Sequence, residues 1–162
     1  MPSWITKFIA IAAAVAPCAV VLAKPEQIRG VSSPIFHYYL QAYRQDPKIP
    51  VMGPEASSEY FNIASGAIQS ANSSAYLTVG QDSTSYKTLT LSAGTAAAAL
   101  GWALEGDTII TGTSSAWGRQ LNFLVCKIGS GDYWQVYLQT GSEVPSGKTC
   151  SNYQSLHLPC LC

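Results

Sequence analysis

The chain has 162 residues, of which 48% are hydrophobic and 11% are charged, whereas about 25% of the residues of an ordinary soluble domain are charged. Nine basic residues balance nine acidic ones, and the sequence contains no basic cluster that could neutralise phosphates. This balance excludes nucleic acid as an expected partner.

The first expected element is a secretory signal peptide over residues 1–23. Lys7 precedes an apolar run, Phe8–Ala23, that ends in small residues, and this is the order of regions in a signal peptide. A membrane-spanning helix needs about 20 apolar residues, whereas this run is shorter and is interrupted by Pro17. We therefore expect cleavage after Ala23, export, and one compact domain in the remaining chain. An uncleaved anchor helix is the alternative.

A leader strand and a proline-rich loop are expected over residues 24–59, as part of the same single domain. The segment Ile35–Tyr43 is dense in aromatic and branched residues, which favour a pleated surface, and it predicts a long first strand. Residues 44–59 contain three prolines. Because each proline removes a backbone donor, we expect this segment to be a surface loop.

Residues 60–162 form the expected main β domain. Apolar residues alternate with a period of two between recurring turn residues. One outline, a hairpin followed by an apolar strand, occurs at 60–79 and again at 102–126. One such unit cannot bury its apolar face alone. The sequence thus predicts an all-β fold, a compact antiparallel β-barrel or sandwich stabilised by disulfides, with a trefoil-like barrel among the alternatives. A further strand is expected at 133–138, and a loop or single turn at 95–100.

An even set of cysteines remains after the signal peptide, which in an oxidising compartment predicts two disulfides. The set is Cys126, Cys150, Cys160 and Cys162. These cysteines allow three pairings, and the residues themselves do not select one. A bridge between Cys160 and Cys162 would close a small, strained ring. A metal site would need a better ligand cluster than these cysteines and His157 provide, so no metal or other cofactor is expected.

Few residues suit acid–base catalysis. Histidine is the usual general base near neutral pH, and the chain contains His37, among aromatic residues, and His157, in the cysteine-rich tail. A glycosidase needs two carboxylates about 5–9.5 Å apart. Glu105 and Asp107 share one turn, but a Glu-Gly-Asp turn is explained by the backbone freedom that a hairpin requires. We therefore expect no enzyme activity.

Three residues are candidates for contact with a glycan. Trp117 and Arg119 lie in a polar loop and Tyr133 in a Gly-Ser-Gly-Asp turn, where the pattern does not demand burial. An exposed indole could stack on a sugar face. The alternative, which we favour, is that Trp117 folds back and plugs one end of the barrel. The sequon Asn72-Ser73-Ser74 lies between two expected strands, and Asn72 is the expected N-glycosylation site.

Four short segments occur in a defined order after the signal peptide: Gly101–Leu104, Phe123–Cys126, Trp134–Tyr137 and Pro145–Cys150. In this order they resemble the secreted fungal cell-wall proteins of the PhiA family. The resemblance covers roughly residues 60–150. Its specificity lies in the order of the four segments and not in any single motif. It implies an extracellular, wall-associated protein without an assigned active site, in a family that includes allergens. It also implies that Cys126 pairs with Cys150. The family's additional cysteine near the mature N-terminus has no counterpart here.

The expected function is that of a secreted structural or surface protein of the fungal cell wall, associated with wall polysaccharide or wall proteins. The alternative is a secreted effector or carbohydrate-binding module that acts on host or wall glycans. The C-terminal residues lack a hydrophobic tail, so we expect no membrane anchor.

Overall fold

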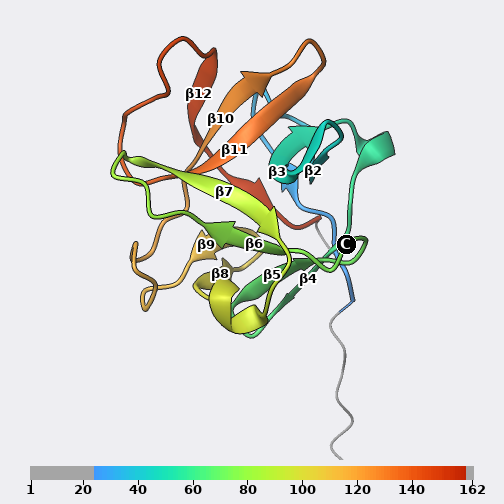
Figure 1. Cartoon of the computed structure of the whole chain (residues 1–162), viewed down its shortest axis with the longest axis vertical. Coiled ribbons are helices and arrows are strands. Elements are labelled where there is room, and N and C mark those ends of the chain that lie inside the picture. Colours follow the sequence, from blue (N-terminus) through green and yellow to red (C-terminus); the bar gives the residue numbers. More distant parts are fainter. Residues whose placement is uncertain (1–23, 160–162) are drawn as a thin grey trace, which may run out of the picture.

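The computed structural model describes residues 24–159 (Figure 1). The expected signal peptide, Cys160 and Cys162 lie outside the described residues. Within this range the chain is built almost entirely of antiparallel strands, so the all-β prediction is confirmed. No helix of the described part is long and apolar enough to cross a membrane.

The strands alternate with short turns along the chain. In order they are β1 (Arg29–Gly30), β2 (Tyr39–Tyr43), β3 (Asp46–Gly53), β4 (Phe61–Ala64), β5 (Ala67–Ser70), β6 (Tyr76–Val79), β7 (Tyr86–Ser92), β8 (Trp102–Glu105), β9 (Thr108–Thr111), β10 (Phe123–Ile128), β11 (Tyr133–Gln139), β12 (Cys150–Gln154) and β13 (Leu156–His157). Two 3₁₀ turns, η1 (Glu55–Ser57) and η2 (Ala96–Ala99), precede β4 and β8. The turn η2 confirms the loop or single turn predicted at 95–100.

Six strands form a closed ring. β4 pairs with β5, β8 with β9, β9 with β13, and β13 with β1. Two backbone hydrogen bonds bridge each of the two remaining gaps. Glu26, just before β1, pairs with Phe61 of β4, and the Gly66 carbonyl accepts hydrogen bonds from the N–H groups of Gly101 and Trp102 at the start of β8. The ring is therefore a small barrel, and its strands β4, β5, β8 and β9 lie in the lower half of the molecule in Figure 1.

Three hairpins, β2–β3, β6–β7 and β10–β11, pack together beside this barrel. β11 pairs with β3 at one end and with β7 at the other, and β3 contacts β7, so the hairpins meet in a triangle. A six-stranded barrel capped by a triangle of hairpins is the trefoil arrangement. The structure thus selects the trefoil among the barrel and sandwich alternatives. β12 adds to the outer side of β10.

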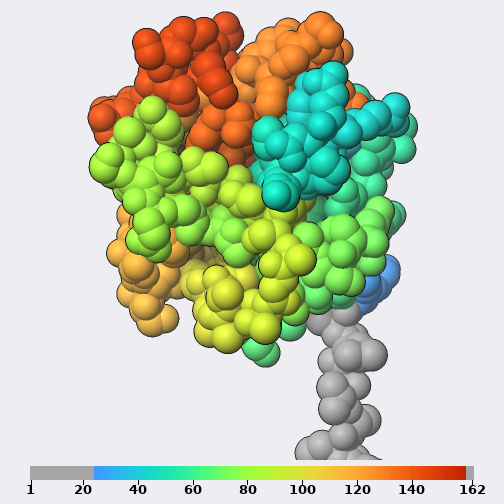
Figure 2. All heavy atoms as spheres, in the orientation of Figure 1, coloured from blue at the N-terminus to red at the C-terminus, as the bar shows by residue number. Residues whose placement is uncertain are grey.

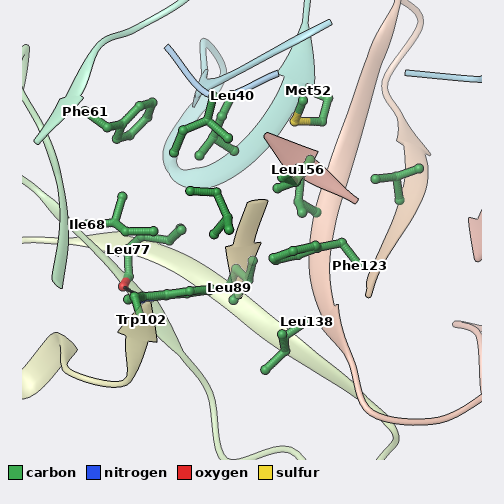
Figure 3. Packing of buried hydrophobic residues seen from close by; sticks show 14 of the residues in the cluster. Leu40, Met52, Phe61, Ile68, Leu77, Leu89, Trp102, Phe123, Leu138 and Leu156 are labelled. Carbon is green, nitrogen blue, oxygen red and sulfur yellow. Dashed lines mark hydrogen bonds between the residues drawn. The ribbon is translucent and has the colours of Figure 1, made fainter. Parts of the chain in front are cut away.

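The three parts of the trefoil contribute equivalent residues to one core. Opposite residues on the cap hairpins form the pairs Leu40–Met52, Leu77–Leu91 and Phe123–Leu138, all at most 3% exposed. In the barrel, the equivalent positions are Ile28, Ile68 and Ile109, each 1% exposed or less. Figure 3 shows side chains from all three parts converging on one interior. The sequence repeat therefore reflects two of three structural units.

The long first strand predicted at Ile35–Tyr43 is wrong in its first half. The strand begins at Tyr39, because residues 35–38 form a turn in which the Tyr38 N–H donates to the Ile35 carbonyl and His37 adopts a φ of 60°. Ile35 is fully buried. The apolar residue that suggested a strand thus inserts into the core from a turn.

The loop predicted at 44–59 is also wrong over much of its length, since β3 contains Pro47 and Pro50. β3 pairs along β2 on one side, but on the other side only Val51 and Met52 pair with β11. The prolines lie before this doubly paired segment. An edge position requires no N–H from proline, so the strand can contain both residues.

Cys126 and Cys150 form a disulfide, as the resemblance implied. They are directly opposite each other in the β10–β12 pair, and Cys126 is fully buried beside Leu124 and Tyr137. The bridge fastens β12 to the outer edge of the cap.

Candidate functional site

An open hollow of about 320 Å³ lies where the hairpins β4–β5 and β8–β9 meet. It is lined by Ser65, Gly66, Leu100, Gly101, Trp102, Ala103, Gly112, Thr113 and Ser114. Gly66 and Gly101 have φ values of 82° and 121°, a region that favours glycine. A Cβ atom on Gly101 would also lie 3.3 Å from the Cβ of Ser115. These glycines allow the close approach of the two hairpins. In Figures 1 and 2 this region forms the lower end of the molecule.

The lining of this hollow combines hydroxyl groups with apolar carbon. Ser65, Thr113 and Ser114 provide the hydroxyls, whereas Leu100, 55% exposed, and Ala103 provide apolar surface. No charged side chain is among the described residues that line it. Apolar surface with a few placed polar groups is the usual composition of a small-molecule site, and it suits the hydroxyls and C–H faces of a neutral sugar.

Trp117 lies next to this hollow and is half-buried against the core. Its six-membered ring approaches Gly101, since a Cβ atom on Gly101 would lie 3.8 Å from Cζ3 of Trp117. Hydrogen bonds fix its loop: Thr111 and Ser115 donate to the Gly118 carbonyl, and the Gln120 side chain donates to the Trp117 carbonyl. This placement is closer to the alternative that we favoured, in which Trp117 folds back onto the barrel, than to a freely exposed platform for a sugar.

Arg119 is engaged by Glu105 at the exposed surface of the β8–β9 hairpin. Its Nε donates to Oε2 of Glu105 at 2.7 Å, and its Nη2 donates to Oε1. The hydrogen bond from Arg119 lowers the pKa of Glu105, and the same bond raises the pKa of Arg119. A carboxyl with a lowered pKa is ionised at neutral pH, so Glu105 is poorly suited to act as a general acid.

Of the two histidines, His157 is bonded to neighbouring strands, whereas His37 is exposed. Nδ1 of His157 lies 3.3 Å from both Oδ1 of Asp107 and Oγ1 of Thr108, and Nε2 lies 2.9 Å from Oγ of Ser155. Both ring nitrogens therefore have partners, and the contacts of Nδ1 tie β13 to Thr108 of β9 and to Asp107 just before it. His37 is exposed, with its ring edge-on to Phe36. Between residues 24 and 159, no group of three or more His, Cys, Asp or Glu side chains could hold a metal ion.

Tyr133 does not share a site with Trp117 and Arg119. It begins β11 and lines a separate hollow of about 220 Å³, together with Tyr43 at the end of β2 and with Arg44 and Gln45 in the turn between β2 and β3. This turn belongs to the cap, whose β2–β3 hairpin lies in the upper half of Figure 1. The predicted glycan-contact residues therefore belong to two regions. Sequence reasoning missed Arg44 and Gln45 as site residues because it assigned them to a surface loop.

Asn72 lies exposed in the turn between β5 and β6, where its N–H bonds the Ser70 hydroxyl. The side-chain amide of the sequon is thus on the surface, as N-glycosylation requires.

We predict that Asn72→Gln removes one N-linked glycan and changes the free energy of unfolding by less than about 0.5 kcal/mol, as for an ordinary surface substitution. Mass spectrometry of secreted protein and denaturant unfolding after enzymatic deglycosylation of both variants measure the two effects. Ser146→Ala changes an exposed residue outside the sequon. It is the control variant and should retain the glycan. An unchanged mass for Asn72→Gln would contradict glycosylation at this residue.

Comparison with family models, curated proteins and solved structures gives no match to this chain. A functional interpretation must therefore be built from its own residues and contacts.

Proposed function

We propose that the protein is a secreted surface component of the fungal cell wall, of the PhiA type, which catalyses no reaction and attaches to neutral wall polysaccharide. The ordered segments of the sequence support the wall assignment, and the expected signal peptide supports export. Attachment to polysaccharide is inferred from the uncharged hollow at the lower end of the barrel, where hydroxyl groups lie beside apolar surface.

The use of carboxylates as structural acceptors supports a non-catalytic role. Glu59 accepts bonds from the Ala42 N–H at 3.0 Å and the Ser70 hydroxyl at 2.7 Å. Asp82 accepts a bond at 2.7 Å from the N–H of Thr88. Each of these carboxylates links separate segments, and Glu105 is held by Arg119. Catalysis would need a carboxylate directed toward a substrate, whereas these groups satisfy neighbouring donors of the fold.

Attachment to a neutral polysaccharide would depend on packing and hydrogen bonds, because the lining of the hollow carries no charge. Such binding is insensitive to salt, since salt screens interactions between charges. The same hollow would serve a carbohydrate-binding module or an effector that acts on host glycans. What separates these functions is where the protein accumulates.

Two experiments test the proposal. The first is retention on insoluble β-glucan and chitin at low and high salt. We expect retention of the parent protein on at least one of them at both salt concentrations, loss with Ser114→Arg, which fills the hollow, and no change with Ser146→Arg, at an exposed serine that does not line it. Failure of the parent to bind either polymer, or release by salt alone, would contradict attachment through this hollow.

The second experiment is fractionation of cultures into washed walls and medium. A wall component should remain with the washed walls, and Ser114→Arg should move it to the medium. Accumulation of the parent protein mainly in the medium would favour the effector alternative over a wall role.

A further inference from the structure

The second hollow has a different chemistry and lies in the cap. It measures about 220 Å³ and is lined by Tyr43, Arg44, Gln45, Ser130, Gly131 and Tyr133. These residues come from the tips of two hairpins, β2–β3 and β10–β11. In Figure 2, the cyan tip of the first hairpin and the orange tip of the second meet at the upper end of the molecule. The hollow is thus distinct from the neutral one at the lower end.

The Tyr133 ring is held in a fixed position within this hollow. It packs edge-to-face against Tyr43, with 5.7 Å between ring centroids and 66° between the planes. Glycines make room for it, since a Cβ atom on Gly53 would lie 2.6 Å from Cε1 of Tyr133, and one on Gly131 would lie 3.1 Å from Cδ2. Tyr43 is itself buried, and its hydroxyl donates to Gln45 at 3.0 Å. A ring fixed before binding loses little entropy when a ligand packs on it.

Arg44 provides the charge of this hollow. Its side chain is exposed at the tip of the β2–β3 hairpin, and it forms no salt bridge with any residue in the range 24–159. The nearby carboxylates of Asp46 and Asp132 are not part of the lining, and Asp46 accepts a bond from the N–H of Lys48. A planar guanidinium binds a carboxylate through two parallel hydrogen bonds. The hollow therefore combines an available carboxylate-binding group with a fixed aromatic ring.

We propose that this hollow binds one uronic acid residue of an acidic polysaccharide. Arg44 holds the carboxylate, the exposed part of the Tyr133 ring packs on the C–H face of the sugar, and Gln45 and Ser130 hydrogen-bond its hydroxyls. Sites for drug-sized ligands measure about 300–1,000 Å³, so the smaller volume here suits a single sugar ring. The inference does not depend on the proposed function, because it concerns different residues and a ligand of different charge.

The test is titration of the full secreted protein with a trigalacturonate, followed by calorimetry and by the NMR signals of the Tyr133 ring. The neutral trigalactose and inorganic sulfate are the comparison ligands. We expect the trigalacturonate to bind and to shift the Tyr133 signals, and the neutral trimer to bind at least about tenfold more weakly. Affinity for the acidic trimer should fall with added salt.

Variants locate the binding. Arg44→Gln should weaken trigalacturonate binding at least about tenfold, whereas Lys48→Gln, which removes an exposed cation on the same hairpin outside the hollow, should change it less than about twofold. Ser114→Arg, in the neutral hollow, should leave it unchanged, so failure of the proposed function and failure of this inference are distinguishable. Absence of trigalacturonate binding, equal losses for Arg44→Gln and Lys48→Gln, or equally tight binding of sulfate would overturn the inference.

Discussion

Trp102→Ala is expected to lower the free energy of unfolding by about 3–5 kcal/mol, the range for removal of a buried large aromatic side chain. Trp102 is 4% exposed, and its ring lies nearly parallel to that of Phe123, with 10° between the planes and 6.4 Å between the ring centroids. Figure 3 shows both side chains in the core. Nε1 of Trp102 donates to the Leu77 carbonyl at 2.8 Å. The substitution thus removes packing between two parts of the trefoil and also leaves a buried carbonyl without its donor. Denaturant unfolding of the purified variant measures the loss.

Two variants control for this result. Leu104→Ala changes a residue on the same strand that is 41% exposed, and it should cost less than about 1 kcal/mol because little apolar area is buried there. Trp102→Phe keeps an aromatic ring but loses the bond to Leu77, and its cost should fall between the two. Leu104 lies two residues after Trp102, on the same face of β8 but nearer the exposed tip of the hairpin. If Leu104→Ala destabilised as much as Trp102→Ala, the deep burial of Trp102 would not explain its large effect.

Local signals were sufficient for the barrel hairpins. The hairpin strands β5 (Ala67–Ser70) and β9 (Thr108–Thr111) lie within the two hairpin segments predicted from the sequence, 60–79 and 102–126. In each hairpin a short apolar alternation is joined by a tight turn, at Ser65–Gly66 or at Gly106. Because a two-residue turn fixes the register between its strands, the local sequence specifies these elements without information from the rest of the chain.

Elements that depend on distant partners were not predictable in the same way. β1 and β13 are two residues long and are strands because they pair with each other. The third copy of the hairpin-plus-strand outline was hidden from the repeat analysis because its paired barrel strands, β13 and β1, lie at opposite ends of the described residues. β7 was also missed, although Leu89 and Leu91 point into the core from an alternating segment. In that case the signal was present in the sequence.

The candidate glycan-contact residues divide between two regions for a geometric reason. Trp117 and Tyr133 are close in sequence, but β10 runs between them for six residues, which at about 3.3 Å per residue carries the chain roughly 20 Å. Arg44 and Tyr133 are distant in sequence but become neighbours because Val51 and Met52 of β3 pair with Gln135 and Trp134 of β11. The sequence analysis assigned residues 44–59 to a loop. It therefore could not predict the pairing of β3 with β11 that brings Arg44 and Tyr133 together in the hollow of the cap.

Loss of the disulfide is the second large effect that we expect. Cys126 and Cys150 are separated by 24 residues in the sequence, and closing a loop of this size restricts the unfolded chain by about 3–4 kcal/mol in the chain-entropy description. Alanine is the appropriate replacement at Cys126, because the site is fully buried beside Leu124 and Tyr137 and a serine hydroxyl would lack a partner there. The double variant Cys126→Ala/Cys150→Ala should therefore unfold at a markedly lower denaturant concentration.

Unfolding of the parent and the double variant, each with and without reductant, separates the contribution of this bridge from other effects. Reductant should bring the parent close to the stability of the double variant, because both then have an unconstrained unfolded chain. A further decrease for the double variant in reductant would indicate a second disulfide, as expected from Cys160 and Cys162. A loss below about 1 kcal/mol on removing both cysteines would contradict the expected contribution of the bridge. In that case the backbone pairing of β12 with β10 would be sufficient to hold the strand.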